Sequence, residues 1–188
     1  MRSKIKKYSK NSIQLASRSL QNGSTIILPT DTVYGIAALA GNKKAVEKIF
    51  KIKKRPISLP LIIFVRSIKD AAKIAEFSSL DVKLAKKFWP GPLTLILKKK
   101  KMKIYNGDKR LSKIGIRIPK NKTVLNILSK IKKPLATTSA NLHKEKNDRK
   151  INNLRILENK NINIAITSNE KMSFKESTLL ETSEKEVK

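Results

Sequence analysis

Apolar strands and amphipathic helical segments alternate along this chain of 188 residues. The pattern starts at residues 9–22, where apolar side chains recur with the helical period and Gly23 ends the helix. Residues 25–28 are β-branched or apolar, and Pro29 ends this first strand. A helix and a sheet each bury one apolar face against the other. The alternation therefore predicts the α/β class, with a twisted, mixed sheet flanked by helices.

The rest of the chain follows the same pattern. Leu61–Val65 is a continuous apolar run, which is typical of a strand buried on both faces. No internal repeat or linker interrupts the pattern, so residues 1–182 are predicted to form one domain and 183–188 a frayed, charged tail. The predicted helices are 9–22, 42–51, 69–76, 80–88 and 124–131, and the predicted strands are 25–28, 61–65, 93–97, 113–119, 134–141, 161–167 and 177–181.

The charge balance indicates an anionic partner. Lys and Arg number 43 against 14 Asp and Glu, which gives a formal net charge of +29. Such a field attracts RNA, DNA or a nucleotide. Biased codon usage is an alternative explanation, because the chain is also rich in Ile and Asn and most of the cations are Lys.

Several classes of protein are excluded by what the sequence lacks. The chain has no cysteine and one histidine, so disulfides, thiolate nucleophiles and metal sites built from Cys or His clusters are excluded. The apolar runs LIIFV and IAALA are too short to cross a bilayer, and no apolar segment follows the basic N-terminus. We expect a cytoplasmic protein that does not associate with membranes and holds no metal of its own.

Four stretches place hydroxyl or cationic side chains at the ends of apolar strands, where α/β proteins commonly bind ligands. The first is LPTDTVYGIAA. Thr30, Thr32 and Tyr34 alternate, so in an extended segment they would face the same side. Their hydroxyls suit a small polar ligand such as an amino acid. The alternative is a strand edge followed by a turn.

The second stretch is KIKKRPISLPLIIF. Lys53 and Arg55 would point the same way in an extended segment, while Lys54 would point away. Pro56 favours an extended conformation at Arg55. Arg binds phosphate bidentately and Lys adds a compact charge, so the pair is a candidate phosphate clamp. A solvated run of charges is the alternative.

The third and fourth stretches are GIRIP and LATTSANL. Arg117 should lie on the face opposite Ile116, either in a site or as an exposed cation of the sheet. The fourth stretch offers hydroxyl, amide and backbone N–H donors for phosphate or carboxylate from Thr137, Thr138, Ser139 and Asn141, although a capped turn would have the same composition.

Carboxylates are nearly absent from these four stretches, with Asp31 as the exception. General acid–base chemistry by a carboxylate pair is therefore not expected, and a Ser–His–Asp triad would have only His143 to use. A site of cations and neutral donors suits phosphoryl or nucleotidyl transfer, in which charge neutralisation and positioning dominate. Mg²⁺ would then arrive with the phosphates.

With these residues in view, the chain resembles the YrdC-like family, the threonylcarbamoyl-AMP synthases. The matching stretches are PTDTVYG, KIKKRPISLPLIIFV, WPGPLT, IRIP, TTSANL and ESTLLE, in that order between Thr25 and Glu181. The resemblance implies a twisted α/β sheet around a concave basic surface. It also implies a nucleotidyltransferase that makes threonylcarbamoyl-AMP and pyrophosphate from L-threonine, bicarbonate and ATP.

The resemblance further implies partners and roles for residues. A transfer complex would pass the threonylcarbamoyl group to tRNA next to the anticodon. The implied catalytic residues are Lys53 and Arg55, which would also bind the nucleotide with Ser139 and Asn141. The implied threonine-binding residues are Thr30, Thr32, Tyr34, Arg117, Thr137 and Ser177.

The sequence departs from the family pattern at several positions. Leu59 stands where many members have Asn, Phe64 where many have His, and Lys113 where Thr is common. Residues 142–148 replace a loop that contains Ser-Gly and proline. These departures leave two alternatives open: a catalytically inert module that binds double-stranded RNA or tRNA, and a related carbamoyl-adenylate enzyme with another acceptor.

Overall fold

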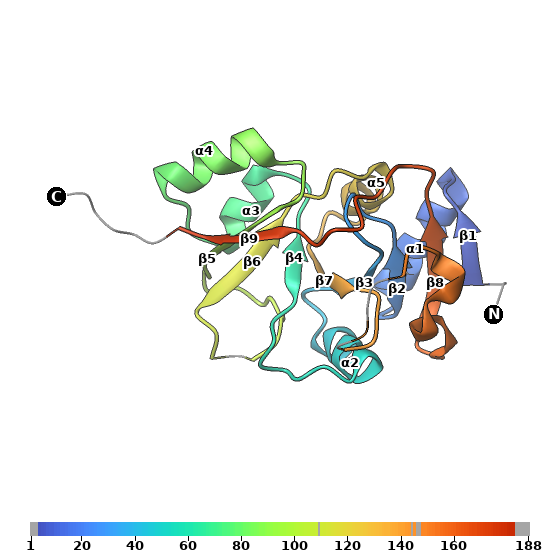
Figure 1. The fold of residues 1–188 in the computed structure, drawn as a ribbon. Coiled ribbons are helices and arrows are strands. Elements are labelled where there is room, and N and C mark those ends of the chain that lie inside the picture. Colours follow the sequence, from blue (N-terminus) through green and yellow to red (C-terminus); the bar gives the residue numbers. More distant parts are fainter. Residues whose placement is uncertain (1–3, 109, 144, 146–147, 183–188) are drawn as a thin grey trace.

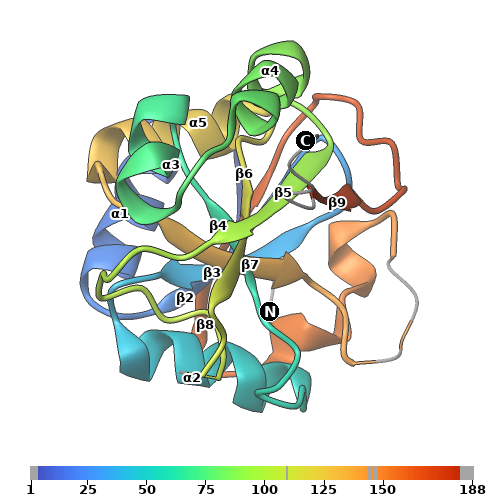
Figure 2. The same ribbon diagram turned by 90° about the vertical axis from the view of Figure 1, so that its left-hand side faces the viewer.

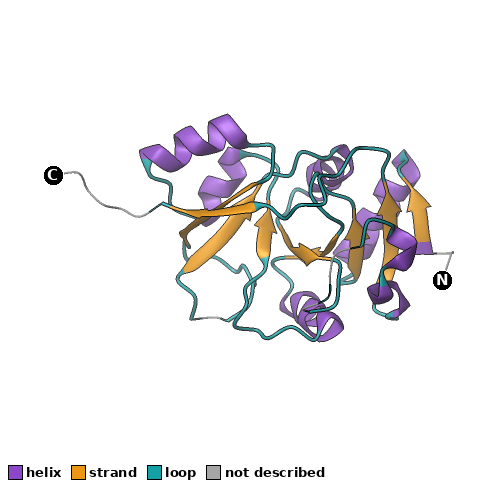
Figure 3. Cartoon of the chain, in the orientation of Figure 1, coloured by secondary structure: helices purple, strands orange, loops and turns teal. Residues whose placement is uncertain are grey.

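The computed structural model of this protein describes residues 4–108, 110–143, 145 and 148–182. These residues form a nine-stranded sheet in the order β1-β8-β2-β3-β7-β4-β6-β5-β9 (Figures 1 and 3). The strands are β1 Ile5–Lys7, β2 Thr25–Leu28, β3 Gly35–Leu39, β4 Ile62–Phe64, β5 Leu93–Lys98, β6 Lys113–Arg117, β7 Leu135–Ser139, β8 Ile162–Thr167 and β9 Thr178–Glu181. The helices are α1 Lys10–Gln21, α2 Lys43–Lys53, α3 Ile68–Ile74, α4 Ser79–Phe88 and α5 Lys122–Ile131, with 3-10 turns η2 Ile151–Asn153 and η3 Arg155–Glu158.

The sheet is mixed, as the sequence predicts. β1 and β2 both run parallel to β8, and β4 runs parallel to β6. β3 is antiparallel to both of its neighbours, β2 and β7. Figure 2 looks along the molecule from the side of β9 and shows how strongly successive strands twist. The strands nearest the two ends of the described chain, β1 and β9, form the two opposite edges of the sheet.

Apolar residues pack on both faces of this sheet. α1 and α5 lie against each other and cover one face, where Leu20 and Ile127 meet strand residues such as Ile26. α2 packs on the other face, with Ile49 fully buried beside Ile27. This two-sided burial explains why the central strands read as continuous apolar runs. No helix within the described residues has the length and apolar character needed to cross a membrane.

Helix ends agree with the capping residues in the sequence. Ser9 and Ser12 form a capping box at the start of α1, and Ser78 forms another with Asp81 at the start of α4. α2 begins one residue later than predicted, with Asn42 as its N-cap, and it continues two residues beyond the predicted end. Its C-cap is Lys54, which has the left-handed conformation with φ of 51°.

Two strands were not predicted. β1 lies in the basic N-terminal segment and pairs with β8, 160 residues away in register (Ile5 with Ala165). β3 has the sequence Gly-Ile-Ala-Ala-Leu, in which small residues give no clear strand signal. Both are strands because a neighbouring strand offers them hydrogen-bond partners, which is a tertiary effect. The predicted tail 183–188 lies outside the described residues, as do residues 144, 146 and 147 of the predicted loop.

Candidate functional site

A cavity of about 220 Å³ lies at the ends of the central strands, where the four predicted stretches meet. Gly35 of β3 helps to form it: a Cβ atom there would lie 2.9 Å from Cγ2 of Thr137, so glycine leaves room for that side chain. The lining residues are Thr30, Thr32, Val33, Gly35, Arg55, Pro60, Ile62, Phe64, Arg117, Thr137, Thr138, Ser139, Glu176, Ser177 and Leu179. They include most of the residues predicted for the site.

The Thr30–Tyr34 segment is a bend rather than the extended segment that was predicted. The Oγ1 of Thr30 accepts hydrogen bonds from the backbone N–H groups of Thr32 and Val33, at 3.0 and 3.1 Å. This bend brings the hydroxyls of Thr30 and Thr32 within 2.9 Å of each other. Tyr34 is buried in the apolar core and is not among the lining residues, so the three side chains do not share a side.

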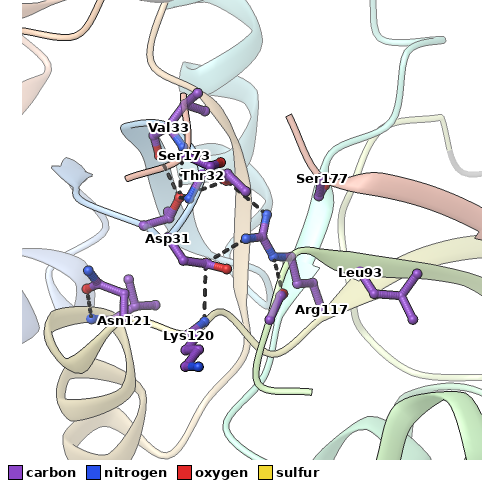
Figure 4. A network of polar contacts seen from close by, with 12 residues as sticks. Asp31, Thr32, Val33, Leu93, Arg117, Lys120, Asn121, Ser173 and Ser177 are labelled. Atoms are coloured by element: carbon purple, nitrogen blue, oxygen red, sulfur yellow. Dashed lines mark hydrogen bonds and ion pairs between the residues drawn. The ribbon is translucent and has the colours of Figure 1, made fainter. Parts of the chain in front are cut away.

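Arg117 is buried beneath the cavity and forms an ion pair, so the alternative of an exposed cation on the sheet is wrong. Its Nη2 lies 2.6 Å from Oδ1 of Asp31, and its Nη1 donates to Oγ1 of Thr32 at 3.1 Å (Figure 4). Its Nε donates to the carbonyl of Gly91 at 2.9 Å. Burial lowers the pKa of Arg117, and the charge of Asp31 opposes that shift. The three contacts to Asp31, Thr32 and Gly91 hold the guanidinium in one orientation. Its central carbon lies 5.7 Å from the ring centre of Phe64.

Lys53 and Arg55 do not lie in one extended segment, so the predicted geometry of the clamp is wrong. Lys53 is the last residue of α2 and Lys54 is left-handed, which turns the chain before Arg55. Arg55 lines the cavity, and its guanidinium donates to the carbonyls of Leu59 and Pro60 at 3.0 and 3.4 Å. The side chain of Lys54 is exposed, as predicted.

The ammonium of Lys53 is buried against the loop that follows β7. It donates to the carbonyl of Ser139 at 2.5 Å, to the carbonyl of Asn141, and to Oδ1 of Asn141 at 2.9 Å. Burial lowers the pKa of Lys53 to about 8, with a smaller contribution from the neighbouring charge of Arg55. Lys53 is not among the lining residues; its contacts hold the end of β7 at Ser139 and the start of the loop that follows.

The β7 end of the cavity offers hydroxyl groups. Ser139 donates from Oγ to Oδ1 of Asn141 at 2.6 Å, and its carbonyl faces Lys53. The Oγ1 of Thr137 is buried and has no hydrogen-bond partner among the described residues. A buried hydroxyl without a partner is costly unless a ligand or water completes it. Thr137 is thus well placed to meet a polar ligand.

Glu176 also lines the cavity, although the sequence patterns did not predict it as a site residue. It lines the cavity next to Ser177, in a strap (residues 173–177) whose first two residues hydrogen-bond to the carbonyls of Asp31 and Thr32. Glu176 lies outside the four stretches from which the site was predicted. Its position directly before Ser177 in ESTLLE was the available signal.

Of the three substituted positions that depart from the family pattern, Phe64 lines the cavity, while Leu59 and Lys113 do not. Phe64 lines the cavity under Arg117, whereas the Leu59 side chain is partly exposed and its carbonyl supports Arg55. Lys113 is outside the cavity and pairs with Glu181. In the loop 142–148, the backbone N–H of His143 donates to the carbonyl of Lys53 at 3.0 Å.

Comparison with known proteins identifies relatives. The sequence profile of the Sua5/YciO/YrdC family, described as "Telomere recombination", matches residues 18–188. A Methanocaldococcus jannaschii protein named provisionally as a threonylcarbamoyl-AMP synthase is 43% identical over 135 residues, which are 71% of this chain and 62% of that protein. The threonylcarbamoyl-AMP synthase of Pyrococcus abyssi is 36% identical over 133 residues, which are 69% of this chain and 38% of that protein.

Solved structures support the same grouping. The crystal structure of P. abyssi Sua5 complexed with L-threonine superposes with a TM-score of 0.83 at 28% identity. The match covers 96% of this chain and 54% of that one. This chain thus spans less than two thirds of the length of the first relatives it matches, and the α/β fold with a twisted sheet is shared across the matched part.

Proposed function

Because the chain belongs to the Sua5/YciO/YrdC family, we propose that it is a threonylcarbamoyl-AMP synthase. The reaction is a nucleotidyl transfer that makes threonylcarbamoyl-AMP and pyrophosphate from L-threonine, bicarbonate and ATP. The observation that carries the proposal is the convergence of candidate amino-acid-binding and phosphate-binding groups, from stretches far apart in sequence, on one cavity.

Threonine would bind at the end of the cavity where Arg117 is fixed. Two of the five guanidinium N–H groups of an Arg remain after the three hydrogen bonds to Asp31, Thr32 and Gly91, and they can pair with the substrate carboxylate. Thr30, Thr32, Thr137 and Ser177 add hydroxyls around it. Tyr34, which was predicted with them, would support the bend from the core rather than touch the ligand.

The phosphates would bind at the end where Arg55 and Ser139 line the cavity. Arg55 would neutralise charge on the triphosphate and on the departing pyrophosphate. Lys53 would act on the nucleotide through the loop that it holds, together with Asn141. A volume of about 220 Å³ is below the ~300–1,000 Å³ of pockets that enclose a drug-sized ligand, so the adenosine would extend beyond this cavity.

The chemistry requires positioning more than proton transfer. The amine of threonine condenses with bicarbonate, forming an N–C bond and releasing water, to give a carbamate, and a carbamate oxygen attacks the α-phosphorus. A new P–O bond forms as the bond to the β-phosphate oxygen breaks, and pyrophosphate leaves with the electron pair. By analogy with oxyanion holes, each preorganised donor that meets the developing charge stabilises the transition state by ~2.7–4 kcal/mol. The described residues contain no group of three His, Cys, Asp or Glu side chains, so Mg²⁺ would be held mainly by the phosphates.

The product would be consumed by a complex that transfers the threonylcarbamoyl group to tRNA. The net charge of +29 supports an encounter with tRNA or double-stranded RNA through a basic surface. The expected cytoplasmic location belongs to the same proposal. The names of the relatives do not favour the alternative of an inert RNA-binding module.

An assay of pyrophosphate release from ATP tests this proposal. With Mg²⁺ present, release should require both L-threonine and bicarbonate, and other amino acids scanned in parallel should support little release. Release that is independent of threonine and bicarbonate, or no release at all, would refute the catalytic assignment.

Arg55→Ala tests the phosphate end of the site. It should lower turnover by ~10²-fold or more, the usual effect of removing one preorganised donor, while the protein stays folded. Lys51→Ala is the matched control, because Lys51 is an exposed cation in the last turn of α2, just before Arg55 in sequence, and lines no part of the cavity. Near-normal turnover of Arg55→Ala would remove Arg55 from the site.

A further inference from the structure

Glu176 brings a negative charge to the cation end of the cavity. It lines the cavity together with Arg55 and is the one carboxylate among the described lining residues. Its charge acts on both Arg55 and Lys53, stabilising their protonated forms and raising the pKa of each against the effect of burial. Arg55, the cation proposed to receive phosphate, thus already has an anionic neighbour in the cavity lining.

The strap that carries Glu176 is anchored on both sides of it. Before Glu176, the backbone N–H groups of Ser173 and Phe174 donate to the carbonyls of Asp31 and Thr32, at 3.0 and 2.9 Å. After it, the hydroxyl of Ser177 lies 3.0 Å from the hydroxyl of Thr94 on β5. Figure 4 shows Ser173 beside the bend and Ser177 on the side of Arg117. Glu176 is therefore held at the cavity by two fixed points.

The carboxylates near the two cations of the cavity differ in burial. Arg117 has a permanent partner, because Asp31 is part of the buried bend and lies 2.6 Å from it. The side chain of Glu176 is exposed. An exposed carboxylate can move away from a cation when a stronger anion arrives, since its charge is readily solvated.

A triphosphate and Glu176 would compete for Arg55. In a chain with a net charge of +29, uncompensated cations in a cavity would also attract free phosphate and nucleic acid backbone. We propose that Glu176 is an internal counter-anion of Arg55 that the triphosphate displaces and that returns to Arg55 as pyrophosphate leaves. Glu176 then lowers the affinity of the site for pyrophosphate. It also favours anions that make contacts elsewhere in the cavity over anions that bind the cation alone.

The test is binding of inorganic pyrophosphate to the full chain, measured by titration calorimetry at low salt without Mg²⁺. Glu176→Gln keeps the size of the side chain and removes its charge. We expect the variant to bind pyrophosphate at least about fivefold more tightly, the lower range of a coupling between two sites. Glu47→Gln is the matched control: Glu47 is on α2 with its side chain 43% exposed, pairs with Lys43, and lines no part of this cavity. It changes the net charge equally and should leave the affinity unchanged.

Several results would overturn the proposal. Equal or weaker binding by Glu176→Gln, equal gains in both variants, or no binding by any of the proteins would each do so. A second titration with Mg²⁺ separates a metal ligand from a counter-anion, because loss of a metal ligand would weaken binding in the presence of Mg²⁺. Glu176→Ala should repeat the gain if the charge alone is responsible.

The proposal builds on the proposed function but can fail independently of it. Pyrophosphate binding is measured without turnover, so it can be read whether or not the chain makes threonylcarbamoyl-AMP. In an active enzyme, Glu176→Gln should also strengthen inhibition by pyrophosphate and leave the KM for threonine unchanged. A raised KM for threonine with unchanged pyrophosphate inhibition would instead place Glu176 at the amino acid.

Discussion

Replacing Arg117 by Met should destabilise the protein strongly, because it leaves a buried carboxylate without its charge partner. The side chains of Arg117 and Asp31 are 3% and 13% exposed, and their closest atoms are 2.6 Å apart. After the substitution, Asp31 would retain the backbone N–H of Lys120 at 3.2 Å as a donor, and its Oδ2 already lacks a partner among the described residues.

Removing one partner of a buried ion pair costs about 3–5 kcal/mol. A chain of this size loses about 2–4 °C in Tm per kcal/mol, so Arg117→Met should lower Tm by roughly 6–20 °C. Urea unfolding followed by circular dichroism would measure the change in the free energy of unfolding. Arg117→Lys should recover only part of it, because an ammonium cannot reproduce the planar contacts to Asp31, Thr32 and Gly91.

The double variant Asp31→Asn/Arg117→Met distinguishes the loss of a partner from a general loss of packing. With both charges removed, no charge remains buried alone, so the double variant should be more stable than Arg117→Met. A loss below about 1 kcal/mol for Arg117→Met, which is typical of an exposed pair, would refute the reasoning. A double variant that loses the sum of the single effects would refute it as well.

Two further predictions concern the β7 end of the cavity. The folded-state pKa of Lys53 is lowered from 10.5 to about 8. At a pH between these two values, Lys53 is protonated in the unfolded chain and deprotonated in the folded protein. We therefore expect the free energy of unfolding of the wild type, relative to that of Lys53→Met, to rise as the pH increases from about 8 to 10.5. Urea titrations across this pH range measure the difference, and a difference that stays flat or falls would contradict the prediction. Thr137→Val removes a buried hydroxyl that has no partner among the described residues, so it should leave stability unchanged or raise it by up to ~1 kcal/mol. The KM for threonine should rise several-fold in this variant, and an unchanged KM in the pyrophosphate-release assay would remove Thr137 from the substrate contacts.

The α/β class and the helix starts could be predicted from the sequence because they depend on local patterns. Ser9 and Ser78 cap their helices through residues three positions later, so the signal and the structure lie in the same short segment. The four candidate stretches were found in the same way, since each joins an apolar strand to polar residues. β3 was missed because its small side chains carry little strand preference and its pairing partners lie elsewhere in the chain.

The directions of the site side chains were decided by tertiary structure. Alternation predicted that Lys53 and Arg55 would point together, but helix α2 continues to Lys53 and the left-handed Lys54 redirects the chain. The ammonium of Lys53 then meets the carbonyl of Ser139, 86 residues later, and Glu176 comes to the same end of the cavity from the far part of the chain. Periodicity describes neighbours along one segment. A single backbone dihedral and the packing of distant strands decide which of those side chains share a cavity, and neither is encoded in a local pattern.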